Sequence, residues 1–286
     1  MMVSGYVRPD GSVGFRNHVA ILTSVGCAND VANKLGRMYP NTLLLTHRQG
    51  CAQLGDDKEQ SARTLAGIGK NPNIAAVLVI GMGCESITAE YLAEEISKAK
   101  KTVEFLDVLN EGGLLAALPK GARFLDKMIQ ETSQMIRVPC SLDALTLGVK
   151  CGLTDTTSGM ATNPAVGLVA DRVIESGGTV VFGETPEIIG AEHILAKRAT
   201  TKEVKERLYR VVSECEERVK ASGMDIRGAN PAPGNIAGGI TTIEEKSLGA
   251  IKKGGGKKLV GLIAIGLALC IVYPQIILWL PAAMVK

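Results

Sequence analysis

Aromatic side chains are scarce in this sequence, and it contains no long run of basic residues. Phe, Trp and Tyr make up 3% of the 286 residues, and 32 basic residues are nearly balanced by 29 acidic ones. Proteins that bind nucleic acid use basic clusters and aromatic platforms on which bases stack. The composition therefore argues against a nucleic-acid partner. The 46% hydrophobic content is enough for a core in each of two ordinary domains.

The sequence also lacks a basic-then-apolar signal peptide at its start and any Cys-x-x-Cys motif. Its seven cysteines, an odd number, have no dense regular spacing. Cysteines without an export signal are typical of a reducing compartment. This predicts a cytoplasmic protein whose thiols serve chemistry or core packing, and the spacing excludes a zinc ribbon or finger.

Short apolar runs alternate with longer amphipathic ones, a pattern that indicates βαβ units and parallel sheets. We expect a first α/β domain over residues 1–138. Its strands are predicted at 19–24, 42–46, 75–80 and 103–108, and its helices at 29–38, 57–69, 88–100 and 111–136.

Pro139 marks the boundary to a second α/β domain, residues 139–258. Asn163 is expected to cap a helix that Pro164 begins. Strands are predicted at 144–149 and 179–182, a long helix at 201–222 and a loop at 228–239. The predicted fold class is α/β, with two Rossmann-like parallel domains of which the second is incomplete at its C-terminus.

Residues 259–285 contain no charged side chain, a stretch long enough to cross a bilayer as a helix. One interpretation is a transmembrane anchor, which would make the protein membrane-associated; basic flanks favour it and two prolines oppose it. A second is that 259–264 is a buried strand of the core. The third, which we prefer, is a reading frame or gene altered near the Gly-Lys run at 254–258, which replaces the true C-terminal part.

Four cysteines each follow a predicted strand: Cys27, Cys51, Cys84 and Cys151. Ligands of open parallel sheets bind outside the carboxyl ends of the strands, so these thiols can converge on one site. The alternative is that each is a small buried hydrophobe, as we expect for Cys215 on an apolar helical stripe.

Other reactive groups follow the same strands. His47 precedes Cys51 by four residues, and Glu85 directly follows Cys84. Thiolate, imidazole and carboxylate together suit iron or zinc. His18 and His193 are weaker candidates, because a lone histidine is more often structural.

The predicted second domain carries polar candidates as well. Residues 155–158 crowd a loop before a helix start and suit an anion or a hydroxyl group. Glu184 and Glu187 follow the strand at 179–182, with a solvated loop as the alternative.

At these residues the sequence resembles the altronate and galactarate dehydratase family. The resemblance runs from about residue 4 to about residue 256. Its motifs include Gly5-Tyr6-Val7-Arg8-Pro9-Asp10-Gly11, Gly50-Cys51-Ala52-Gln53-Leu54-Gly55-Asp56-Asp57, Gly81-Met82-Gly83-Cys84-Glu85, Lys150-Cys151-Gly152, Ala161-Thr162-Asn163-Pro164-Ala165 and Glu244-Glu245-Lys246-Ser247-Leu248-Gly249-Ala250. The sequence departs from the family at 151–155, where Cys-Gly-Gly-Ser-Asp is usual.

The resemblance implies a lyase that removes water from a sugar acid such as altronate or galactarate to give a 2-keto-3-deoxy acid. The family's usual cofactor is Fe²⁺, with Mn²⁺ or an iron–sulfur cluster as alternatives. Sulfolactate sulfo-lyase is a similar sister activity. Split forms of both enzymes pair a large subunit that opens like this chain with a small SAF-type subunit, which we expect as a partner in an oligomer.

Dehydration of a hydroxy acid needs a base for the C–H beside the carboxylate, stabilisation of the enediolate and an acid for the departing hydroxyl. A metal can supply the stabilisation as a Lewis acid, and Arg16 with Arg48 can clamp a carboxylate. Our candidate catalytic residues are His47, Lys246, Glu85 and Glu184. The substrate-binding candidates are Arg16, Asn17, Arg48, Asp155, Ser158 and Asn163, and the metal candidates are Cys27, Cys51, Cys84 and Cys151.

Two other functions compete with this one. A dinucleotide oxidoreductase is suggested by Gly81-x-Gly83 after a predicted strand and by Asp107 at the end of the next, although Ser86 stands where the third glycine belongs. The non-enzyme alternative is a degenerate or membrane-tethered remnant that keeps the fold without turnover.

Overall fold

A computed structural model describes residues 2–150, 152 and 154–259. The described chain divides into two compact units, residues 2–141 and residues 142–259. Each has its own hydrophobic clusters, and each is described by itself.

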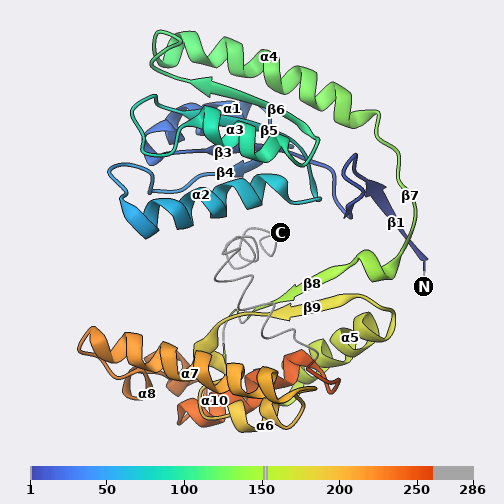
Figure 1. Ribbon diagram of the computed structural model, residues 1–286, viewed down its shortest axis with the longest axis vertical. Coiled ribbons are helices and arrows are strands. Elements are labelled where there is room, and N and C mark those ends of the chain that lie inside the picture. Colours follow the sequence, from blue (N-terminus) through green and yellow to red (C-terminus); the bar gives the residue numbers. More distant parts are fainter. Residues whose placement is uncertain (1, 151, 153, 260–286) are drawn as a thin grey trace. The chain divides into compact units, whose positions relative to one another are not determined.

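A parallel sheet of four strands forms the centre of the first unit (Figure 1). Its order is β4-β3-β5-β6, from strands β3 (His18–Thr23), β4 (Leu43–Leu45), β5 (Ile74–Gly81) and β6 (Thr102–Asp107). The helices that alternate with them are α1 (Asn29–Met38), α2 (Gly55–Lys70), α3 (Ala89–Ser97) and α4 (Leu114–Ser133). All eight predicted elements are confirmed, with ends that differ by a few residues.

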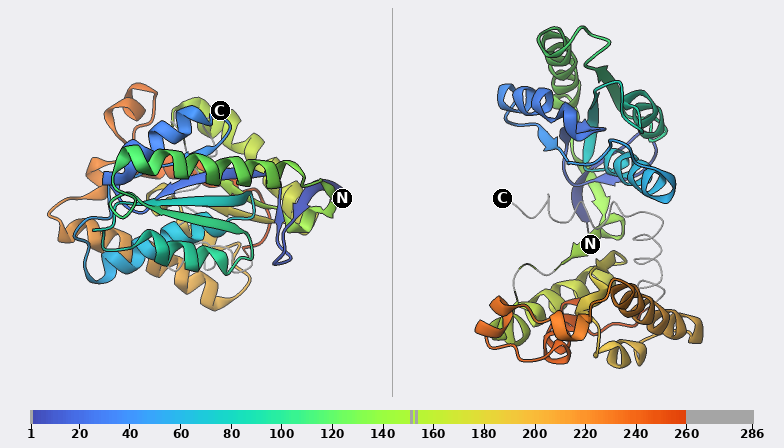
Figure 2. Two further views of the ribbon diagram at one scale, coloured as in Figure 1. Left: turned by 90° about the horizontal axis from the view of Figure 1, so that it is seen from above. Right: turned by 90° about the vertical axis from the view of Figure 1, so that its left-hand side faces the viewer.

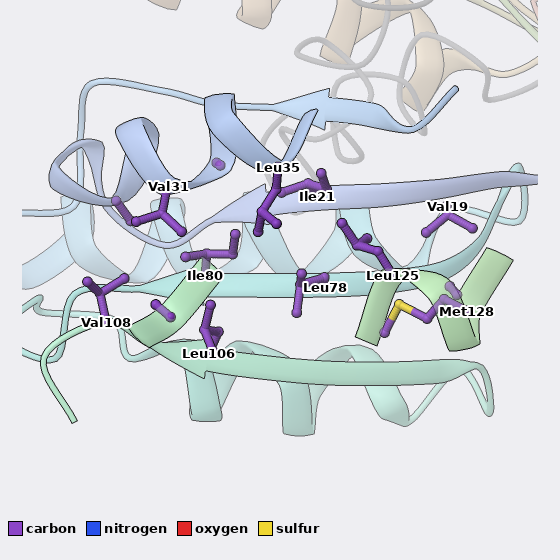
Figure 3. Close-up of a cluster of buried hydrophobic side chains, with 14 of the residues drawn as sticks. Val19, Ile21, Val31, Leu35, Leu78, Ile80, Leu106, Val108, Leu125 and Met128 are labelled. Atoms are coloured by element: carbon purple, nitrogen blue, oxygen red, sulfur yellow. The ribbon is translucent and has the colours of Figure 1, made fainter. Parts of the chain in front are cut away.

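Helices cover both faces of this sheet, α1 and α4 on one side and α2 and α3 on the other (Figure 2, right). Side chains of α1 and α4, such as Leu35 and Leu125, pack on Ile21 and Leu78 of the strands (Figure 3). All eight residues of β5 are buried, as expected for a central strand with both faces covered. Their continuous apolar run is the reason why the sequence predicts this strand.

A small antiparallel sheet that the sequence did not predict joins the two ends of the first unit. Strand β1 (Met2–Val7) lies between β2 (Val13–Gly14) and β7 (Val138–Ser141). The buried Arg8 fastens it to the rest of the unit, because its guanidinium donates to the carbonyls of Pro72 (2.7 Å) and Arg16 (2.8 Å).

The second unit contains a two-stranded parallel sheet, β8 (Thr146–Val149) and β9 (Thr179–Phe182), in its described part. Its helices are α5 (Asn163–Glu175), α6 (Glu192–Ala196), α7 (Lys202–Ala221), α8 (Ile226–Ala229), α9 (Pro233–Ala237) and α10 (Ile243–Ala250). Helices α5, α6, α7 and α10 gather on one side of the two strands (Figure 1). The α/β class is confirmed. Within its described residues, the support for the Rossmann-like prediction in this unit is the parallel pair β8 and β9.

Two local predictions for the second unit are wrong. The segment 228–239, expected to be a loop, holds the end of α8 and all of α9. Asn163 is the first residue of α5 and not its cap, because a π-helical turn (Ser158–Thr162) leads into α5 without a break. Its side chain instead donates to the carbonyl of Gly249 in α10 (3.1 Å).

Most of the apolar stretch 259–285 lies outside the described residues. Leu259, the last described residue, is buried and pairs in parallel with Ala199. Within the described part of the chain, every helix is too short or too polar to cross a membrane.

Candidate active site

An open pocket of about 340 Å³ lies at the carboxyl ends of the two strands in the second unit. Lys150 directly follows β8, and Glu184 stands two residues after β9. Because Val149 pairs with Phe182, the two side chains leave adjacent strands at the same level, and Lys150 Nζ lies 3.1 Å from Glu184 Oε1. The prediction that Glu184 belongs to a site at strand ends agrees with this geometry. The pocket is lined by Lys150, Gly152, Thr154, Glu184, Pro186, Glu187, Asn230, Asn235 and Lys246.

Lys246 of α10 lines the same pocket. Its ammonium donates to the side-chain oxygens of Asn230 (2.9 Å) and Asn235 (3.0 Å). Asn235 is itself held, since its amide nitrogen donates to the carbonyl of Thr154 (2.8 Å) and its oxygen accepts from the N–H of Ala232 (3.1 Å). An ammonium has three N–H groups, so among the described residues these bonds leave one for a ligand.

Glu187 lines the same pocket but is only 5% exposed. Its carboxylate forms an ion pair with Lys253, which is 2% exposed. Lys253 lies in a 3₁₀ turn (Ile251–Gly254) after α10. The pocket therefore has a buried charge pair behind its wall.

The predicted substrate-binding residues Asp155, Ser158 and Asn163 make bonds within the protein. Asp155 Oδ1 accepts from the hydroxyl of Thr157 (2.7 Å) and from the N–H of Ser158 (2.9 Å), and these bonds lower the pKa of Asp155. Gly159 meets Gly249 so closely that a Cβ at position 159 would lie 3.2 Å from the Cα of Gly249. This segment thus supports α10, the helix that carries Lys246.

Three loops lie together at the carboxyl edge of the sheet in the first unit. The N–H of Gly26 donates to the carbonyl of Gln49 (2.9 Å), and the N–H of Ser86 donates to that of Gly50 (3.2 Å). One of the predicted thiol ligands stands on each loop, and all three are exposed: Cys27, Cys51 and Cys84. The fourth, Cys151, lies outside the described residues.

His47 lies at this edge with both ring nitrogens engaged. Nε2 lies 2.8 Å from the carbonyl of Thr23, and Nδ1 accepts from the N–H of Gln49 (3.1 Å). Burial lowers its pKa, against the smaller opposing effect of the Thr23 carbonyl. In this arrangement His47 fixes two loops and offers no free nitrogen to a substrate, and a catalytic role for His47 stays a prediction.

Glu85 is a buried carboxylate that braces the loop after β5. It accepts from the hydroxyl of Ser24 (2.9 Å) and from the N–H groups of Met82 (3.1 Å) and Gly83 (2.6 Å). Burial raises its pKa, but these bonds and that of its own N–H outweigh burial, so its pKa is lowered. All three bonds hold neighbouring protein groups, so in this structure Glu85 braces the loop, and its catalytic role stays a prediction.

The structure does not bring Arg16 and Arg48 together for the predicted clamp on one carboxylate. Arg16 and Asn17 precede β3, whereas Arg48 lies at the edge where β3 ends. Six strand residues span about 20 Å, too far for one carboxylate. Asn17 has a structural role, since its amide accepts from Arg8 (2.8 Å) and donates to the carbonyl of Thr132 (2.9 Å).

Cysteine, histidine and carboxylate groups could hold a metal where three of them meet. Within residues 2–150, 152 and 154–259, no three such side chains do so. Cys151, the fourth predicted ligand, lies outside these residues, so the four-cysteine site stays a prediction.

The two glycines of the dinucleotide alternative are explained by neighbouring carboxylates. A Cβ at Gly81 would lie 2.1 Å from Glu85 Oε1, and one at Gly83 would lie 2.5 Å from Asp107 Oδ1. Negative groups stand where a pyrophosphate would have to approach. The geometry thus gives no support to dinucleotide binding.

Sequence reasoning missed four residues of the pocket region: Lys150, Asn230, Asn235 and Lys253. Lys150 carried a usable signal, because it directly follows a predicted strand. The asparagines lie in a Gly- and Pro-rich segment interpreted as plain loop.

Comparison with known proteins places both units in one family. The second domain of D-galactarate dehydratase/altronate hydrolase matches residues 5–133, and the C-terminal domain of D-galactarate/altronate dehydratase matches residues 142–270. The chain belongs to the galactarate/altronate dehydratase family. The resemblance seen in the sequence is thereby confirmed, and the second match continues beyond Lys258, where we had expected the sequence to change.

Individual relatives carry both activities named above. The chain is 39% identical over 252 residues to (2R)-sulfolactate sulfo-lyase subunit beta of Chromohalobacter salexigens, covering 87% of this chain and 64% of that protein. It is 35% identical to altronate dehydratase of Bacillus subtilis (88% and 52%) and 32% identical to galactarate dehydratase (L-threo-forming) of Escherichia coli (92% and 54%). The chain thus spans between about half and two thirds of the length of these relatives.

Proposed function

We propose that this chain is the large subunit of a lyase that dehydrates a sugar acid of the altronate or galactarate type. The observation that carries the proposal is the pocket of the second unit, which the ion pair of Lys150 and Glu184 lines together with Lys246, within a domain of the dehydratase family. Lysines bind carboxylate groups, and a carboxylate beside an ammonium supplies a base and an acid.

In this proposal Lys246 binds the substrate carboxylate and stabilises the enediolate that forms from it. Glu184 accepts the proton from the carbon beside the carboxylate. Lys150 donates a proton to the hydroxyl on the next carbon, which leaves as water. The enol product then tautomerises to the 2-keto-3-deoxy acid, so that atoms and charges balance.

Sulfolactate sulfo-lyase activity is the second candidate, favoured by the relative that is 39% identical. Its first step is the same removal of a proton beside the carboxylate. Sulfite, unlike hydroxide, leaves without needing a proton. Lys150 should therefore be essential for loss of water and dispensable for loss of sulfite.

We also propose a small partner subunit of the SAF type. The support is that the sulfo-lyase relative is named as a beta subunit. Iron, bound at a site that includes Cys51 and Cys84, remains our proposal for the cofactor. It rests on the resemblance and on three exposed thiols carried by adjoining loops.

The test is an assay of the chain, co-expressed with its small subunit, on altronate, galactarate, related aldonates and sulfolactate. Formation of a 2-keto acid reports dehydration, and sulfite release reports the alternative. Lys246→Met should raise KM about tenfold to a hundredfold, because a hydrogen bond to a charged group contributes about 1.5–3 kcal/mol. Lys252→Met is the control, since Lys252 is exposed and outside the pocket. An unchanged kcat and KM of Lys246→Met would show that the pocket takes no part in the reaction.

A further inference from the structure

The buried pair of Lys253 and Glu187 is not explained by stability. Both side chains are almost fully inaccessible to solvent, and Lys253 is among the largest fully buried side chains of the chain. Removing two charges from water costs about as much as their attraction returns, and apolar replacements of such pairs are often neutral or stabilising. A pair at the wall of a pocket therefore calls for a local explanation.

Glu187 ends the short turn that carries Glu184. The turn (Thr185–Glu187) is closed by the N–H of Glu187, which donates to the carbonyl of Glu184 (2.9 Å). Glu184 has a left-handed backbone (φ 71°, ψ 86°), which a non-glycine residue keeps only where its surroundings enforce it. The same backbone brings its carboxylate to Lys150.

The backbone that follows Lys253 is held by the side chains of Arg198 and Asp171. Arg198 donates to the carbonyls of Gly254 (3.2 Å) and Lys257 (2.6 Å), and Asp171 accepts from the N–H groups of Gly256 (2.8 Å) and Lys257 (3.2 Å). The segment after α10 is thus a rigid support, with the Lys253 ammonium as its contact to the turn at Glu187.

We propose that Lys253, acting through Glu187, is a positioning residue that holds Glu184 in place for proton transfer. The inference rests on the proposed function of the pocket. Neither Lys253 nor Glu187 needs to touch the substrate in this role. Their loss should reduce turnover while leaving the carboxylate anchor at Lys246 intact.

The experiment replaces the pair in the full chain with its small subunit. Lys253→Met alone leaves a buried carboxylate unpaired and can fail to fold, so the decisive variant is Lys253→Met combined with Glu187→Leu. We expect it to fold, with kcat reduced on the order of 10²-fold, as misplacement of a catalytic group does, and with KM within about twofold of the parent by the same reasoning. Val212→Ala, in the core of α7, is the control for a general loss of stability.

A second measurement is independent of activity. Hydrogen exchange of the peptide covering 184–188 should be faster in the double variant than in Val212→Ala, because the turn has lost its anchor. Normal kcat in the folded double variant overturns the proposal, as does exchange no faster than in the control. If the parent protein has no lyase activity, the proposed function fails, and exchange alone decides whether the pair holds the turn.

Discussion

Glu85 illustrates, at the scale of single residues, a carboxylate whose partners are all protein groups. Its three bonds to Ser24, Met82 and Gly83 fix the loop between β5 and α3. In Glu85→Gln the amide oxygen can still accept from the two N–H groups, but bonds to a charged carboxylate become bonds to a neutral amide. We expect a loss of about 1–3 kcal/mol in the free energy of unfolding at pH 7, because hydrogen bonds to charged groups are the stronger ones.

The pH dependence of this loss has a definite sign. The folded state lowers the pKa of Glu85 below the ordinary 4.5. Its stabilisation is therefore fully present above pH 4.5 and is lost as the pH falls through the lower folded pKa. Denaturant titrations of parent and Glu85→Gln should converge in that acidic range. The exposed Glu94→Gln is the matched control, and a gap that persists into acid would contradict the assignment.

The thiols at the carboxyl edge of the first unit give a second prediction for single residues. Iron content of anaerobically prepared protein should fall in Cys51→Ser and Cys84→Ser, because a hydroxyl is a poorer ligand than a thiolate. Cys215→Ser should lose stability only, since Cys215 packs against the apolar cluster of α6 and α7. Elemental analysis and absorbance spectra measure this, and equal iron in all variants would rule out the thiols as ligands.

Sequence could predict only some residues of the pocket. Glu184 and Lys246 were found, the first through its place after a strand and the second through a family motif. The importance of Asn235 and Lys253 lies in contacts across 11 and 66 positions of sequence, which no local pattern of residues predicts. The predicted pairing of Arg16 and Arg48 rested on residue type, which says nothing about which end of a strand each occupies.

At the scale of elements, periodicity predicted the long helices and central strands well. Strands β1, β2 and β7 escaped because their pairing joins distant, half-exposed segments without an apolar run. Helix α9 was missed because Pro and Gly suggested a loop, although a proline is well accommodated in the first turn of a helix.

Helix α10 allows a prediction at this scale. Thr242 caps it by accepting from the N–H of Glu245 (3.1 Å), and Thr201 caps α7 by accepting from that of Val204 (3.3 Å). Replacing either with Ala should cost about 1 kcal/mol of stability. Only Thr242→Ala should also weaken substrate binding, because α10 carries Lys246. Calorimetric titration measures this, and equal affinities in both variants would contradict the link between cap and pocket.

For the whole molecule, the structure changes how the C-terminal stretch is understood. Leu259 is buried in the core of the second unit, and its backbone bonds to Arg198 (2.9 Å) and Thr200 (3.2 Å). A change of reading frame at 254–258 would replace Leu259 and disrupt this part of the core. The family match extends to residue 270. The altered sequence that our preferred interpretation places near 254–258 would therefore have to begin further along the chain.

A chain ending at residue 258 should therefore unfold its second unit at lower denaturant than one ending at residue 270. Loss of a buried leucine and its backbone bonds corresponds to about 2–5 kcal/mol. Limited proteolysis followed by mass spectrometry would show cleavage within 142–258 and an intact 2–141 fragment. Equal resistance of both chains would show that the core is complete without Leu259.

The pairing of β1 with β7 puts the entrance and exit of the first unit side by side, since Met2 lies opposite Ser141 in the small sheet. A module closed in this way can be spliced between other segments, or rejoined in a circular permutation, without stretching its fold. The matching family domain is described as the second domain of D-galactarate dehydratase/altronate hydrolase. Because the two ends of the unit lie side by side at Met2 and Ser141, neighbouring domains can be attached, exchanged or removed at one place in the fold.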